Sequence, residues 1–188
     1  MIAGKYAFVL SSTNWMSVYA TKDLKFITKY SIPERSIEHM PFRFNENVMF
    51  VTEDQLIVCT PSSKRTVIKP KRPTGIPLQI GPSYFIVMST SEISLYEFDS
   101  ITSTIAIRQV VTRNIVSQHV HDAKDLQWIA CKVFDEKLYC LDRVNGLFEF
   151  DPANLINLKR VSQRSGCFDF IRPASERGTF LFQCYING

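Results

Sequence analysis

The most distinctive polar segment of the sequence is a cluster of basic residues. It holds five cations within nine residues and contains no acidic residue. Its members are Lys64, Arg65, Lys69, Lys71 and Arg72. Such a cluster can bind the phosphate groups of nucleic acid or anionic lipid, or act as a nuclear import signal. A solvated loop of a mildly basic protein, here with net charge +4, would carry the same residues. The cluster is a candidate patch for an anionic ligand or partner, with the solvated loop as the alternative.

A second polar pattern is the pair His119 and His121, separated by one residue. Residues two apart on a β-strand share a face, so both rings could reach one metal ion. Asp122 follows directly, but the sequence offers no third ligand on a neighbouring strand. We therefore expect a surface strand with two polar positions, and we predict no metal site.

Catalytic and cofactor signatures are absent from the sequence. It contains no G-x-S-x-G motif, no P-loop and no glycine-rich dinucleotide turn, and it has only seven glycines. The acidic pairs Glu53–Asp54 and Asp135–Glu136 lie where tight turns are expected, which predicts turn formation. The sequence thus predicts a protein that is not an enzyme and binds no cofactor. A hydrolase or lyase with carboxylates around a central channel is the catalytic alternative.

The cysteines and the apolar runs bear on the compartment. The five cysteines are Cys59, Cys131, Cys140, Cys167 and Cys184. Their number is odd, no two form a C-x-x-C pair, and four lie in apolar runs, where cysteine acts as a small buried hydrophobe. This predicts a reducing compartment rather than a disulfide scaffold.

No apolar run reaches the roughly 20 residues of a transmembrane helix, and no signal peptide is evident. We expect a cytoplasmic protein, with peripheral attachment to endomembranes or a nuclear location as alternatives.

The elements that would position these residues are short β-strands. Runs rich in aromatic and β-branched residues are bounded by Pro, Gly, Asn, Asp or Ser, which is typical of strands. Four pairs of runs predict hairpins with an apolar inner strand: Tyr6–Leu10 with Trp15–Ala20, Val48–Thr52 with Gln55–Cys59, Tyr84–Met88 with Glu92–Tyr96, and Trp128–Cys131 with Lys137–Leu141. Trp15 and Trp128 are expected to anchor the core. The helix candidate Pro152–Val161 is better explained as strand and loop.

The hairpins recur with a period of roughly 40 residues, which is the length of a four-stranded propeller blade. Further strand candidates lie between and after them: Leu24–Tyr30, Ile37–Phe44, Thr104–Val111, Asn114–Val120, Cys167–Ile171 and Thr179–Tyr185. The sequence therefore predicts one all-β domain over residues 1–188, a β-propeller of four to five four-stranded blades. A β-sandwich is the alternative fold.

So few blades imply an open ring, since six to eight are commoner. An open edge exposes unpaired backbone and an apolar face. We therefore expect either that the chain is part of a longer protein or that another chain or segment completes the ring.

One stretch carries a family resemblance. Its elements are Gly75–Ile80, Gly81–Val87, Glu92–Tyr96 and Ile107–Val110. Their order resembles the citron-homology type of propeller, over about residues 75–142, whereas the Gly-His and Trp-Asp signatures of WD repeats are absent. The resemblance implies a non-catalytic domain that recruits small GTPases or partner subunits, as in endolysosomal tethering subunits. It transfers no functional residue.

The expected function is a non-catalytic interaction scaffold in a multi-subunit complex, with vesicle trafficking as its setting. The alternative is a nucleic-acid-associated propeller that uses the basic cluster at residues 64–72.

Overall fold

The structure is a computed structural model. It describes residues 1–32, 41–51, 55–68, 75–99, 101–102, 104–163, 167–173 and 180–184. Within these residues nearly all regular structure is β-strand, and a single short helix is present, α1 (Arg113–His119). No helix in this described part of the chain is long and apolar enough to cross a membrane.

The strands form four antiparallel four-stranded sheets and one two-stranded sheet. We number the first four sheets as blades 1 to 4. Blade 1 comprises β1 (Ile2–Ala3), β2 (Tyr6–Leu10), β3 (Trp15–Ala20) and β4 (Phe26–Ser31). Blade 2 comprises β5 (Phe42–Phe44), β6 (Asn47–Val51), β7 (Gln55–Cys59) and β8 (Lys64–Ile68). Blade 3 comprises β9 (Ile76–Gln79), β10 (Tyr84–Met88), β11 (Ile93–Asp99) and β12 (Thr104–Val111). Blade 4 comprises β13 (Trp128–Phe134), β14 (Lys137–Asp142), β15 (Gly146–Asp151) and β16 (Asn154–Ser162). The two-stranded sheet comprises β17 (Cys167–Pro173) and β18 (Phe180–Cys184).

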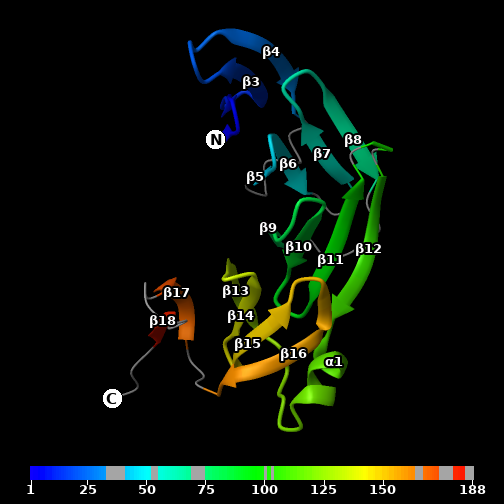
Figure 1. Ribbon diagram of the computed structural model, residues 1–188, viewed down its shortest axis with the longest axis vertical. Helices are drawn as coiled ribbons and strands as arrows, with labels where there is room; N and C mark the ends of the chain where they lie inside the picture. Colours follow the sequence, from blue (N-terminus) through cyan, green and yellow to red (C-terminus); the bar gives the residue numbers. More distant parts are fainter. Residues whose placement is uncertain are drawn as a thin grey trace.

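The sheets follow one another along an open arc (Figure 1). Blade 1 lies at one end, and the β17–β18 sheet lies at the other, where β17 contacts β13 and β14. Within each blade the strand order follows the chain, so each strand pairs with its sequence neighbours. Antiparallel four-stranded sheets stacked in chain order are the blades of a β-propeller. The predicted all-β fold with a four-stranded repeat is therefore confirmed.

Consecutive blades are held together by apolar cores between their faces. The core between blades 1 and 2 includes Phe8, Val18, Val48, Phe50 and Ile57. The core between blades 2 and 3 includes Phe44, Met49, Val58, Phe85 and Tyr96. The core between blades 3 and 4 includes Ile86, Leu95, Trp128, Phe148 and Phe150, and Val116 of α1 joins it.

Strand β6 shows why the inner strands are continuously apolar. Val48 and Phe50 face blade 1, whereas Met49 between them faces blade 3, and all three side chains are buried. Successive side chains of a strand point to opposite faces. A strand between two blades therefore needs apolar residues at every position, and the alternating polar pattern of a one-sided sheet is lost.

Two sequence-based assignments are wrong around α1. Residues Asn114–Val120 were expected to be a strand, but Arg113–His119 form a helix that packs Val116 into the core. The predicted hairpin that starts at Trp128 also occupies a different position in its blade from the other three predicted hairpins. It joins the first two strands of blade 4, whereas the other three hairpins join the second and third strands of their blades. The segment containing α1 lengthens the connection before blade 4 and shifts the repeat.

The cysteine prediction also needs correction. Cys131 and Cys140 form a disulfide, with their Cα atoms 4.2 Å apart. They are direct partners across β13 and β14, and the Cys131 Sγ lies 3.3 Å from the Met88 Sδ in blade 3. Directly opposed residues on neighbouring antiparallel strands have their side chains close together. The expectation that these two residues serve only as small hydrophobes is therefore wrong.

Cys59 behaves as the sequence predicts for a buried thiol. It is fully buried in the core between blades 1 and 2, and burial raises the pKa of its thiol to about 12, although nearby Lys64 acts in the opposite direction. Only the thiolate reacts with alkylating agents. We expect Cys59 to stay unmodified by iodoacetamide at pH 8 in the folded protein and to be alkylated in 6 M guanidinium. Peptide-level mass spectrometry measures both. Equal alkylation in the two conditions would contradict a closed contact between blades 1 and 2.

A buried aspartate organises the turn between β14 and β15. The Asp142 side chain is fully buried; its Oδ1 accepts the backbone N–H groups of Val144 at 3.0 Å and Asn145 at 2.7 Å. Its Oδ2 accepts the backbone N–H of Gln127 at 2.5 Å. The Asn145 amide group donates to the same carboxylate and exchanges hydrogen bonds with the backbone of Lys124. This network fastens the segment before β13 to the β14–β15 turn.

Gly146 follows this turn in a conformation that suits glycine. Its φ is +93°, a region that other residues rarely adopt. A Cβ at this position would lie 2.1 Å from the backbone oxygen of Ser162 on the neighbouring strand. The close approach of β15 and β16 at this point therefore depends on the absence of a side chain.

Candidate functional site

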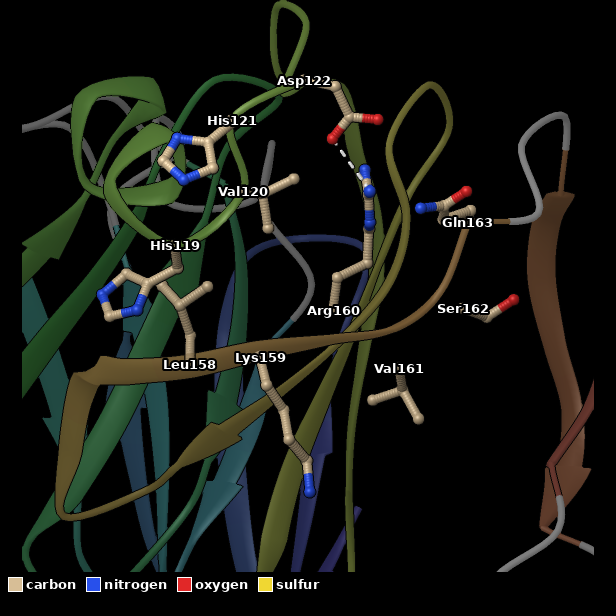
Figure 2. Close-up of a pocket in the computed structure, with 10 residues that line it drawn as sticks. All are labelled: His119, Val120, His121, Asp122, Leu158, Lys159, Arg160, Val161, Ser162 and Gln163. Carbon is tan, nitrogen blue, oxygen red and sulfur yellow. Dashed lines mark ion pairs between the residues drawn. The ribbon is translucent and has the colours of Figure 1, made fainter.

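An open cleft of about 750 Å³ lies between the end of α1 and the last residues of β16 (Figure 2). Its lining includes His119, His121, Asp122 and Arg160. The Arg160 guanidinium forms an ion pair with the Asp122 carboxylate at 2.8 Å. This hydrogen-bonded pair lowers the pKa of Asp122. The carboxylate is thus committed to a cation of its own chain.

The two histidines of the cleft do not share a strand face. His119 is the last residue of α1 and His121 lies in the following turn, so the geometric basis of the metal hypothesis is gone. Figure 2 shows the Asp122 side chain directed to Arg160, away from both rings. Within the described residues no group of three metal-ligating side chains is present. The prediction that this pair forms no metal site remains an expectation for the protein as a whole.

The basic cluster is only partly described. Lys64 and Arg65 open strand β8 rather than a loop, and residues 69–72, with Lys69, Lys71 and Arg72, lie outside the described residues. The Lys64 Nζ donates a hydrogen bond of 2.7 Å to the backbone oxygen of Ser31 in blade 1. One member of the cluster therefore serves the contact between blades 1 and 2. The anionic-patch hypothesis rests on the remaining members.

Of the two acidic pairs, likewise, only one lies within the described residues. Asp135 and Glu136 form the tight turn between β13 and β14, with φ of +48° and +58°. Two consecutive residues at positive φ are typical of the hairpin turns that match strand twist, so the predicted turn role is confirmed. The pair Glu53–Asp54 lies outside the described residues.

Exposed apolar side chains gather on the face of blade 1 that points away from blade 2. Seven of the twelve exposed large hydrophobic side chains in the described residues fall within residues 1–27. Four of them lie on this face, which we call the outward face of blade 1: Ile2, Val9, Trp15 and Phe26. Their exposed fractions are 64%, 51%, 39% and 54%. Exposed apolar side chains gathered on one face are typical of interaction surfaces.

Strand register places these side chains together. Ile2 pairs with Ala7, Ala7 pairs with Tyr19, and Tyr19 pairs with Phe26, so these residues form a row across the four strands. The rings of Tyr19 and Phe26 meet edge to face with their centroids 5.7 Å apart. The row is apolar over its whole length and is already ordered by contacts within the blade.

Trp15 occupies the far end of the same face. Its ring is stacked under the Lys29 Nζ, which lies 4.6 Å from the ring centroid. The sequence predicted Trp15 as a core anchor, which is wrong, because 39% of the residue is exposed, whereas Trp128 is buried as expected. The sequence predicted an exposed apolar face at an open edge but did not place it on blade 1, because a strand that is apolar on both faces does not reveal which face has a neighbour.

Comparisons with known proteins show the fold of this chain. Its sequence matches no protein-family model and no curated protein. Its structure is similar to BamB from Moraxella catarrhalis, with a TM-score of 0.58, 14% identity, and coverage of 90% of this chain and 50% of that chain. It is also similar to a protein from Lactobacillus plantarum, with a TM-score of 0.53, 14% identity and coverage of 88% and 56%. A functionally unknown protein from Desulfotomaculum acetoxidans gives a TM-score of 0.54, 14% identity and coverage of 86% and 54%.

These similarities and the sheet topology show an all-β protein with a BamB-like β-propeller fold. The alternative prediction, a β-sandwich, is therefore not the fold of this chain. No sequence match ties it to the citron-homology or WD-repeat families. The chain spans about half the length of the propeller-type chains that it matches.

Proposed function

We propose that the protein is a non-catalytic β-propeller scaffold, and that a partner chain or segment covers the outward face of blade 1. The observation that carries the proposal is the exposure of Ile2, Val9, Trp15 and Phe26 on one sheet face. The corresponding faces of blades 2, 3 and 4 are covered by the preceding blade. Covering about 100 Å² of apolar surface is worth about 2.5 kcal/mol, so a face of several such side chains favours association.

The arrangement of the described polar residues supports a binding role rather than catalysis. In the cleft between α1 and β16 the Asp122 carboxylate is paired with Arg160, and the two histidines are not aligned with it (Figure 2). An acid–base mechanism would require such groups to converge on one substrate atom. Binding needs only a rigid surface, which stacked blades provide.

Affinity purification from the native cells tests the proposal. We expect at least one additional protein chain, either another protein or an untagged copy of this one, to co-purify with the tagged protein in near-stoichiometric amount. We expect that chain to be lost when Val9→Lys and Phe26→Lys are introduced together, because two charges would then be buried unpaired at the contact. Quantitative mass spectrometry compares the two samples. An identical protein content in both would contradict the assignment of the outward face.

The finer form of this proposal is a setting in membrane trafficking, with a cytoplasmic location and a domain that recruits small GTPases. It is supported by the resemblance of residues 75–142 to citron-homology propellers. The identity of the co-purifying chain decides it: a GTPase or a tethering subunit supports the trafficking setting, and its absence from the purified complex counts against it.

A second candidate function is binding to nucleic acid through the basic cluster. It is favoured by five cations within nine residues of a chain with net charge +4. Each phosphate contact contributes about 0.9 to the slope of log affinity against log salt concentration. We expect the combined Lys69→Ala, Lys71→Ala and Arg72→Ala variant to lower the magnitude of this slope by about 2 to 3 for a double-stranded oligonucleotide.

The matched control for this prediction is Lys64→Ala. The Lys64 ammonium group is already bonded to the backbone of Ser31, so its removal is expected to weaken the contact between blades 1 and 2 and to leave the salt slope nearly unchanged. Fluorescence anisotropy at several salt concentrations measures both variants. Affinity that is unchanged by the triple substitution would exclude the nucleic-acid role of the cluster.

A further inference from the structure

We infer that Cys131 and Cys140, which face each other across β13 and β14, form a reversible thiol–disulfide site. A low-molecular-weight disulfide of the glutathione type oxidises the pair, and the corresponding thiol reduces it. The closed bond fastens the first two strands of blade 4 where they pack against blade 3. The site lies in blade 4, so it does not depend on the function proposed for the outward face of blade 1.

Strand register prepares the two cysteines for bond formation. They are direct partners with their Cα atoms 4.2 Å apart, and the ladder stays in register from this pair to the turn between β13 and β14. Such a short spacing is typical of the antiparallel pairs whose side chains approach most closely. The hairpin itself therefore holds both sulfur atoms within bonding reach, and the bond can close or open without movement of the backbone.

The two cysteines differ in their access to solvent. Cys140 is fully buried in the core between blades 3 and 4, whereas Cys131 is only partly buried beside it. Thiol–disulfide exchange begins at a sulfur that a reactant from solution can reach. Cys131 is therefore the cysteine that meets the external disulfide or thiol, and Cys140 resolves the intermediate. Cys59 is fully buried and has no disulfide partner within the described residues, so it takes part in neither step.

The exchange balances without any further reactant. In the oxidising direction, the Cys131 thiolate attacks one sulfur of glutathione disulfide, forms a mixed disulfide and releases a glutathione thiolate. The Cys140 thiolate then attacks the Cys131 sulfur, closes the protein bond and releases the second glutathione thiolate. The two protons of the protein thiols end on the two glutathione molecules, and two electrons pass from the protein to glutathione disulfide. Reduction by glutathione reverses both steps.

The bond lies at the contact between two blades. The Cys131 Sγ is 3.3 Å from the Sδ of Met88 on β10, and both Met88 and Cys140 belong to the core between blades 3 and 4. A covalent link between neighbouring strands removes open conformations of the hairpin, which makes local opening less favourable. We therefore expect slower amide hydrogen exchange in β13 and β14 when the pair is oxidised.

A glutathione titration of the purified protein tests the site. The protein is reduced with dithiothreitol, freed of the reductant, equilibrated in buffers from fully reduced to fully oxidised glutathione, and quenched in acid. The remaining thiols are labelled with N-ethylmaleimide under denaturing conditions and quantified by peptide-level mass spectrometry. We expect Cys131 and Cys140 to lose the label together, at one midpoint, and to regain it when reduced glutathione is restored. Cys59 is expected to keep its label at every ratio.

Two single substitutions separate the roles of the cysteines, and each is the matched control of the other. In Cys140→Ser the resolving sulfur is absent, so Cys131 is expected to accumulate a mixed disulfide with glutathione. In Cys131→Ser the buried Cys140 is expected to carry about tenfold less of this adduct, because exchange requires an accessible sulfur. Circular dichroism verifies that both variants keep the strand content of the unaltered protein.

Each outcome decides the inference. Coupled and reversible loss of label at Cys131 and Cys140, with the adduct formed mainly on Cys131, supports it. A pair that stays bonded in reduced glutathione is a permanent structural disulfide, and a pair that stays labelled in glutathione disulfide is two separate thiols; either result overturns it. Equal adduct formation in the two variants overturns it as well, as does hydrogen exchange in β13 and β14 that is the same in both states.

Discussion

Replacing Gly146 by alanine is expected to destabilise blade 4 by about 3 kcal/mol or more, as the sum of left-handed backbone strain and overpacking. The φ of +93° disfavours any residue with a Cβ, and the new methyl group would lie 2.1 Å from the Ser162 backbone oxygen. Because that oxygen belongs to the backbone of β16, it cannot move aside without breaking the pairing of β15 and β16. Chemical denaturation followed by Trp128 fluorescence, in a Trp15→Phe background, measures the loss.

Gly81→Ala is the matched control for this prediction. A Cβ at Gly81 would meet only the Tyr84 side chain, at 3.6 Å, which is an ordinary van der Waals distance. We expect this substitution to change the free energy of unfolding by less than about 1 kcal/mol. Equal losses for Gly146→Ala and Gly81→Ala would show that β15 and β16 do not approach each other as described.

Asp142→Ala is the second substitution with a large expected effect. We expect it to lower the free energy of unfolding by about 3 to 5 kcal/mol, which is typical when one partner is removed from a buried charged network. The carboxylate is fully buried and accepts hydrogen bonds from Gln127, Val144 and Asn145. Its removal leaves those backbone N–H groups without this acceptor, and the N–H of Asn145 is buried away from water. The segment before β13 would also lose its attachment to the β14–β15 turn. The midpoint of denaturant unfolding measures the loss.

Two further variants separate the network from the turn itself. Asp142→Asn keeps the shape of the side chain but removes the negative charge, so we expect a smaller loss than with alanine. Asp99→Ala removes a carboxylate from the turn after β11, where it accepts hydrogen bonds from Ile101 and Thr102 in an exposed setting. Water can replace those bonds, so we expect a clearly smaller effect. A loss at Asp99 as large as that at Asp142 would contradict the importance of burial.

The strands of this chain could be predicted from sequence to a large extent, for a physical reason. A blade between two others is covered on both faces, so its middle strands are apolar at nearly every position and stand out between polar turns. Strand β7 was predicted with its observed bounds, Gln55–Cys59, and β12 likewise, Thr104–Val111. Strand β1, with two residues, is too short to give a pattern.

Features that depend on tertiary contacts were not predictable from sequence. The helix α1 has seven residues, and its N-cap residue Thr112 makes no side-chain capping bond, so its sequence carries no clear start signal. The Cys131–Cys140 pair depends on strand register, which spacing alone does not fix. An exposed apolar face at an open edge could be expected from the number of blades, but its place on blade 1 could not, because a list of apolar residues contains no information about neighbours.

The strictly sequential pairing of strands has a consequence for how the chain folds. Every strand of blades 1 to 4 pairs only with strands next to it in sequence, so the contact order is low for an all-β protein. Low contact order favours rapid folding, and nearest-neighbour stacking lets each blade act as a separate cooperative unit. Amide hydrogen exchange should then be slowest in blades 2 and 3, which have a blade on each side. Blade 1, with a single neighbour, would exchange first, so local opening begins at the surface that a partner would protect.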